Sequence, residues 1–181
     1  DKVLLPAYSF VGTLNAVRCL GLQPVFVDCS EKGTGFDLIH LQQTVAQVDN
    51  LRAAIAVHLF GHPFTAEVFA VLQRAGVPLI EDCAQWFTRE SPFAAKENSS
   101  IVRCFSFDST KNIYGLGTLG AIAVNNRGLV NKMRAIRNQG QGDETVQTGF
   151  NAKPNEIQAC FFNILAESFD ERESRRLQLI D

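Results

Sequence analysis

The chain has 181 residues, of which 46% are hydrophobic and 20% charged, and its formal net charge is −2. This length and composition suit one globular domain with a sizeable core, and they exclude disordered and collagenous proteins. The chain lacks the basic excess of nucleic-acid-binding proteins, and it has neither an apolar run of about 18 residues nor a signal-peptide pattern at its start. Neither nucleic acid nor a membrane is therefore predicted as a partner.

The cysteines indicate a reducing compartment. There are five, an odd number, and no two of them stand in a C-x-x-C spacing. Paired, extracellular disulfide frameworks have even counts, so free thiols in a cytoplasmic protein are predicted.

Apolar runs of strand length alternate with longer stretches of helical periodicity along the chain. This pattern predicts an α/β fold with three αβα layers and a mostly parallel sheet. The expected strands are residues 3–5, 24–27, 53–59, 77–80, 102–107 and 120–124, and the expected crossover helices are residues 11–20, 37–47, 65–75 and 128–137.

The last part of the chain differs from the rest. A polar, glycine-rich stretch follows Arg137, and a long helix is expected from near Pro154, with Ile157, Phe161 and Ile164 on one face. The chain starts on an apolar run and stops inside a charged helical pattern. We therefore interpret it as a piece of a longer protein.

Polar residues that follow apolar strands are the first candidates for a site, because ligands of open α/β sheets bind at the carboxyl ends of the strands. The segment 77–85 delivers Glu81, Asp82 and Gln85 to that edge. Asp82 could pair with a cationic ring nitrogen, or it could cap a helix or lie solvated in a loop. Glu81 is expected to be a structural acid.

A second such segment, residues 104–112, ends in Lys111, five residues after Ser106. A lysine amine forms Schiff bases with carbonyl compounds, and enzymes that use pyridoxal phosphate combine that lysine with an acid at the pyridine nitrogen. An ordinary solvent-exposed lysine is the alternative. His58 and His62 lack a third ligand at useful spacing, so no metal site is predicted.

Taken together, these segments resemble the DegT/StrS (DegT/DnrJ) sugar aminotransferases, a family of fold-type-I enzymes that use pyridoxal phosphate. The matching segments, in family order, are PAYSFVGT (6–13), EDCAQ (81–85), RNQG (137–140) and GFNAKPNEIQA (149–159). They are similar to the family patterns P-x-x-T-[FW]-x-x-T, E-D-x-A-[QH], R-N-H-G and G-Y-N-[YF]-R-M-x-E-[LI]-Q-A.

The resemblance implies a role for each of six residues. Lys111 would hold the cofactor as a Schiff base and move the proton, Asp82 would bind the pyridine nitrogen, and Gln85 would contact the ring hydroxyl. Phe10 would stack on the ring, and Ser106 would bind the phosphate of the cofactor. Asn151 would reach the cofactor phosphate in a neighbouring subunit. The implied substrates are an amino-acid donor, expected to be glutamate, and a nucleotide-linked keto-sugar, in a homodimer.

The resemblance also implies what surrounds this segment. Residues 1–140 would be the cofactor-binding large domain without its phosphate-binding first helix, and residues 141–181 would lead toward a C-terminal small domain. The large domain would thus be truncated at both ends, and the piece alone is expected to bind the cofactor poorly.

The departures from the family pattern are Leu119, Gln139 and Lys153, and they concern the substrate side more than the cofactor side. They leave open a regulatory relative without turnover. A second alternative is a sugar dehydratase on the same scaffold, although such relatives carry histidine at the position of Lys111.

Overall fold

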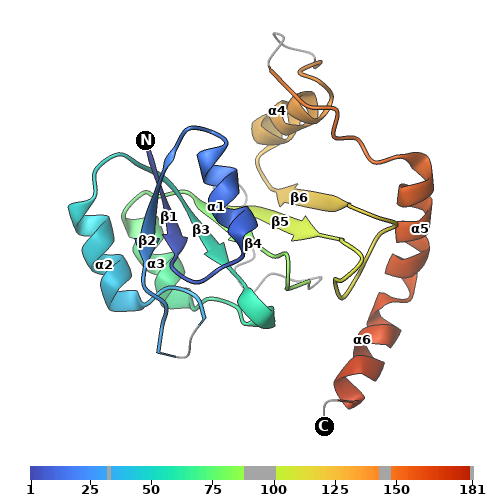
Figure 1. Ribbon diagram of the computed structural model, residues 1–181, viewed down its shortest axis with the longest axis horizontal. Helices are drawn as coiled ribbons and strands as arrows, with labels where there is room; N and C mark the ends of the chain where they lie inside the picture. The colour runs from blue at the N-terminus through green and yellow to red at the C-terminus, as the bar shows by residue number, and fades with distance from the viewer. Residues whose placement is uncertain (32–33, 88–100, 143–147, 180–181) are drawn as a thin grey trace.

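The computed structural model describes residues 1–31, 34–87, 101–142 and 148–179. Its centre is a six-stranded sheet in the order β2-β1-β3-β4-β5-β6, in which the first five strands are parallel and β6 runs antiparallel to β5 (Figure 1). The strands are β1 (Lys2–Pro6), β2 (Gln23–Val27), β3 (Leu51–Val57), β4 (Leu79–Asp82), β5 (Val102–Ser106) and β6 (Gly120–Val124). The predicted α/β class with a mostly parallel sheet is confirmed.

The helices of the described residues are α1 (Val11–Arg18), α2 (Leu38–Gln47), α3 (Ala66–Arg74), α4 (Arg127–Arg137), α5 (Glu156–Glu167) and α6 (Phe169–Gln178), with a short 3₁₀ turn, η1 (Leu59–Gly61). Asp37 caps α2, because its carboxylate accepts a hydrogen bond from the backbone N–H of His40 at 2.7 Å. None of these helices combines the length and the apolar composition that a bilayer crossing requires.

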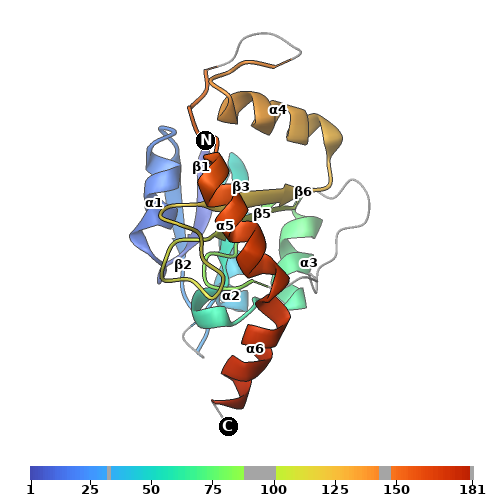
Figure 2. The same cartoon turned by 90° about the vertical axis from the view of Figure 1, so that its right-hand side faces the viewer.

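Helices cover both faces of the sheet, and the alternation of side chains along β1 shows how. Leu4 packs into the core cluster that contains Leu41 of α2 and Val68 of α3. Val3 and Leu5 point the other way, into a second cluster with Val17 of α1. Figure 2 shows α1 and α3 on opposite sides of the strands. The predicted αβα layering is therefore confirmed.

Truncating a core side chain of α2 is expected to destabilise the fold. Leu41 is fully buried, so Leu41→Ala should lower the free energy of unfolding by about 2–5 kcal/mol. Ile39, on the same helix, is 66% exposed, and Ile39→Ala should change the free energy of unfolding by less than about 0.5 kcal/mol. Urea denaturation of the two variants measures both values. Equal effects would contradict the assignment of the buried face.

Most predicted elements are shifted by only a residue or two, but two differences matter for the site. The strand expected at 53–59 ends at Val57, because the chain turns at His58 (ψ 66°) into η1, inside which Phe60 adopts a left-handed backbone (φ 56°). The strand expected at 77–80 is instead β4, which runs through both acids: Ala56 pairs with Glu81 and Val57 with Asp82. Strand pairing therefore fixes the directions of the two carboxylates.

The chain end also differs from expectation. The single helix predicted from Pro154 is two helices, α5 and α6, which meet at Ser168 (Figure 1). The predicted face is not buried in this chain, since Ile157 and Ile164 are exposed. Phe162 and Phe169 pack instead against Phe107 and Ile113. This packing attaches both helices to the segment that follows β5; the division of the chain at residue 140 stays a prediction.

Candidate active site

The carboxyl ends of β1, β3, β4 and β5 lie at one edge of the sheet, because these strands are parallel. Asp82 is the last residue of β4 and Ser106 the last of β5. Lys111 follows Ser106 in a turn, in which its backbone N–H donates to the carbonyl oxygen of Asp108 at 3.0 Å. The strand-end residues predicted from the sequence thus share the edge where open α/β sheets bind ligands.

Asp82 is half-buried and lies toward α1. Its Oδ2 accepts a hydrogen bond from the hydroxyl of Thr13 at 3.0 Å, and its Oδ1 accepts one from the backbone N–H of Ala84 at 3.1 Å. No lysine, arginine or histidine of the described residues forms an ion pair with it. Asp82 therefore caps no helix and is an oriented carboxylate that a cationic group can still pair with.

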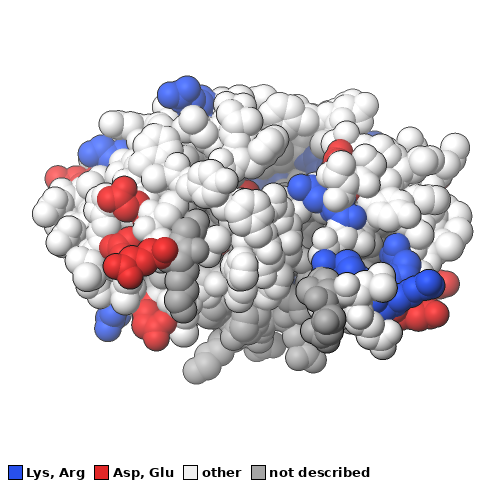
Figure 3. All heavy atoms as spheres, turned by 60° about the horizontal axis from the view of Figure 1, so that its bottom comes forward, with Lys and Arg blue, Asp and Glu red and all other residues white. Residues whose placement is uncertain are grey.

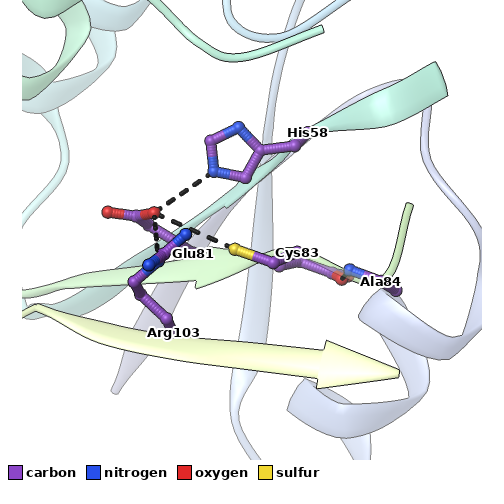
Figure 4. A network of polar contacts seen from close by, with 6 residues as sticks. His58, Glu81, Cys83, Ala84 and Arg103 are labelled. Atoms are coloured by element: carbon purple, nitrogen blue, oxygen red, sulfur yellow. Dashed lines mark hydrogen bonds and ion pairs between the residues drawn. The ribbon is translucent and has the colours of Figure 1, made fainter. Parts of the chain in front are cut away.

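Glu81 points to the opposite face, as successive residues of a strand do. It is fully buried, and its Oε2 lies 3.3 Å from Nε2 of His58 and 3.3 Å from Nε of Arg103 (Figure 4). The Arg103 contact is an ion pair rather than an aligned hydrogen bond, since Nε has no hydrogen-bond partner. The two adjacent acids thus have different environments, one paired with a cation and one free of it.

His58, Glu81 and Cys83 also bring possible metal ligands within 4.8 Å of one another, a grouping that the spacing of His58 and His62 did not reveal. One observation argues against a metal here: Arg103 already places a cation on the Glu81 carboxylate. Burial raises the pKa of the Cys83 thiol to about 12, although Arg103 opposes the rise. We interpret the group as a hydrogen-bonded ion network.

A cavity of about 540 Å³ contains two of the predicted site residues, Gln85 and Lys111. The other lining residues come from η1, from the segments after β4 and β5, and from α6; they are Phe60, Gly61, Trp86, Phe87, Thr110, Asn112, Glu173 and Arg176. The loops after three strands and one distant helix therefore line the cavity in which the lysine lies.

The amide of Gln85 has a defined orientation in this cavity. Its Oε1 accepts a hydrogen bond from the backbone N–H of Phe60 at 2.6 Å. Because a backbone N–H only donates, the oxygen of the amide must face Phe60, and the NH₂ group is left for a ligand. The left-handed backbone of Phe60 is an uncommon conformation for a non-glycine residue, of the kind that accumulates at functional sites.

The other predicted residues do not line this cavity. Phe10 caps the start of α1 with its backbone, and the residue is 71% exposed. The hydroxyl of Ser106 accepts a weak bond from the N–H of Asp108 at 3.4 Å. Asn151 is exposed and pairs through its backbone with Asn138. Their predicted roles, like those of Asp82, Gln85 and Lys111, stay predictions.

Sequence reasoning missed three contributors to this edge. Thr13 holds Asp82, and its place three residues after Phe10 in the first matched segment could have indicated it. Glu173 and Arg176 form an ion pair on α6 at the cavity. No local pattern indicated them, because only the packing of α6 brings them near Lys111.

Fold and site together define an α/β protein with a lysine and an oriented carboxylate at the carboxyl edge of a mostly parallel sheet. The chain belongs to the DegT/DnrJ/EryC1/StrS aminotransferase family, whose model matches residues 1–181. The resemblance stated from the sequence motifs is thereby confirmed.

Individual relatives agree with this membership. The chain is 30% identical over 162 residues to UDP-N-acetyl-3-dehydro-alpha-D-glucosamine 3-aminotransferase of Acidithiobacillus ferrooxidans, covering 88% of this chain and 43% of that protein. It is similar to the structure of S. venezuelae DesV in complex with a ketimine intermediate, with a TM-score of 0.83 and 28% identity over 94% of this chain and 46% of that one.

A third relative is NtdA from Bacillus subtilis, whose structure contains the bound cofactor PMP. The TM-score is 0.79 and the identity 27%, over 90% of this chain and 37% of that one. The chain spans less than half the length of each of these three relatives.

Proposed function

We propose that the full-length protein is a pyridoxal-phosphate-dependent aminotransferase that moves an amino group from an amino acid, expected to be glutamate, to a nucleotide-linked keto-sugar. The observation that carries the proposal is the placement of Lys111 and Gln85 in one cavity, beside a strand end that bears Asp82 without a cationic partner. The cofactors and sugar nucleotides in the names and titles of the relatives support it.

The donor set fits pyridoxal phosphate, which when bound supplies an electron sink for the substrate carbon. Lys111 would hold the cofactor covalently and carry the proton between donor and acceptor. Asp82, fixed by Thr13, would keep the pyridine nitrogen protonated. Gln85 presents its NH₂ group, which suits a ring oxygen that accepts a hydrogen bond.

The charges around the cavity suit anionic substrates. Figure 3 shows lysine and arginine side chains most densely on one side of the face toward which β1 and β3 point, with acidic side chains directly beside some of them. Arg176 lines the cavity, but its guanidinium is paired with the Glu173 carboxylate, which lines the cavity too. An anionic substrate would have to take the place of that carboxylate to form the paired hydrogen bonds that a guanidinium makes with carboxylate and phosphate oxygens.

The proposal includes a homodimer in the cytoplasm. Asn151 is exposed and outside the cavity of its own chain, as a residue that completes a partner's site would be. Large apolar side chains that include Phe10, Phe60 and Phe150 are also exposed. All five cysteines are free thiols, which suits a reducing compartment.

An assay with glutamate and a panel of nucleotide-linked keto-sugars tests the function. We expect the full-length protein to form 2-oxoglutarate and an amino sugar in equal amounts, which mass spectrometry detects. Loss of water from the sugar, or release of ammonia without amino transfer, would favour the dehydratase. No turnover of any sugar despite bound cofactor would favour the regulatory relative.

A further inference from the structure

A buried ion network lies behind the candidate site, on the face of the sheet opposite to Asp82. Its members come from three neighbouring positions of the sheet: His58 directly after β3, Glu81 in β4 and Arg103 in β5 (Figure 4). The Glu81 carboxylate is at the centre, with both nitrogen contacts at 3.3 Å and the Cys83 thiol at 3.9 Å. One carboxylate therefore links three adjacent strand positions.

The network is more polar than stability of the fold requires. His58 and Glu81 are fully buried, and the Arg103 side chain is 14% exposed. Glu81 Oε1 and His58 Nδ1 have no hydrogen-bond partner among the described residues. Replacing a buried ion pair by apolar residues of similar volume is often neutral or stabilising, so stability of the fold does not by itself explain this network.

Two connections join the network to the site. Glu81 directly precedes Asp82 in β4, so any shift of one residue moves the other. The Trp86 ring lines the Lys111 cavity, and its centre lies 4.3 Å from the centre of the His58 ring and 5.8 Å from the Arg103 guanidinium carbon. The position of the Asp82 carboxylate and that of the Trp86 ring in the cavity wall therefore both depend on the network.

We propose that Glu81 and Arg103 form a positioning pair for the cofactor site. Their ion pair, with His58, fixes the end of β4 and the Trp86 wall, so that Asp82 meets the ring nitrogen in one geometry. Their charges also cancel, which leaves Asp82 as the unpaired charge at this strand end. The inference rests on the proposed function, because it assigns the pair to the cofactor of that site.

The test is a pH titration of the visible absorbance of the lysine-bound cofactor in the full-length protein, together with its dissociation constant for pyridoxal phosphate. Glu81→Gln leaves the Arg103 cation uncompensated, so the absorbance midpoint should fall by about 0.5–1 pH unit. Arg103→Met removes the cation beside Glu81, so the midpoint should rise, by less than Glu81→Gln lowers it, because a buried carboxylate without a cation partly takes up a proton. Each change should weaken cofactor binding roughly tenfold.

The double variant Glu81→Gln/Arg103→Met restores charge balance, and its midpoint should return near the wild-type value. Leu41→Ala is the matched control, because it weakens the same core without touching the pair; its midpoint should not move. If either single variant fails to fold, Arg103→Lys is measured in its place. Lysine keeps the positive charge, so the absorbance midpoint should not change, while the affinity for pyridoxal phosphate should fall.

Single variants that lower the melting temperature as Leu41→Ala does, with unchanged midpoint and affinity, would overturn the positioning role and leave a structural one. A wild-type protein without any lysine-bound absorbance would instead refute the proposed function, so the two failures are distinguishable.

Discussion

Replacing Lys111 with alanine is expected to abolish the visible absorbance of the protein mixed with pyridoxal phosphate and to reduce amino transfer at least a thousandfold. The variant lacks the amine that binds the cofactor covalently and the group that carries the proton, and proton transfer alone accounts for roughly 10²–10⁴ in rate. Absorbance spectra and steady-state kinetics of the full-length protein measure the two effects.

Two further variants sharpen this test. Lys111→Arg keeps the positive charge in the cavity but not the nucleophilic amine, so it should lose activity as the alanine variant does. Lys132, exposed on α4, provides the control, and Lys132→Ala should retain both absorbance and rate. An alanine variant at 111 that keeps the absorbance would show that another lysine holds the cofactor.

Replacing Asp82 with asparagine is expected to reduce amino transfer roughly a hundred- to a thousandfold, while the protein still folds. The amide has nearly the same shape and its single oxygen can still accept the hydrogen bond from the backbone N–H of Ala84, while its NH₂ group can donate to the Thr13 hydroxyl, but it carries no charge to keep the ring nitrogen protonated. A rate loss of this size is typical when one preorganised electrostatic partner of the transition state is removed. Single-turnover kinetics with glutamate would locate the loss in the first half-reaction.

Two controls separate charge from position at Asp82. Thr13→Val removes the hydrogen bond but leaves the carboxylate, so the rate should fall by less than about tenfold. Asp28, exposed directly after β2 and paired with His40, is an acid at another strand end, and Asp28→Asn should have no effect on the rate. Equal losses in Asp82→Asn and Asp28→Asn would contradict a specific role for Asp82.

The local sequence determined the fold class and most of the elements. The apolar strand β2 lies between the helical stretches α1 and α2, and α2 has its own start signal, as Asp37 shows. Hydrophobic periodicity and helix capping depend on residues close to one another in the chain, so both can be recognised in the amino-acid sequence. The same holds for Asp82 and Lys111, because polar residues at or shortly after the end of an apolar run are visible without any structure.

The tertiary structure alone decided how these residues are used. Pairing of β4 with β3 and β5 sends Glu81 to Arg103 and Asp82 to Thr13, although the two acids are adjacent in sequence. The left-handed turn at Phe60 gives the Gln85 amide its orientation across 25 residues. These contacts depend on strand register and on packing between distant segments, which no local pattern encodes. The sequence therefore indicated which groups could act, and the long-range contacts of the sheet decided in which direction each one points.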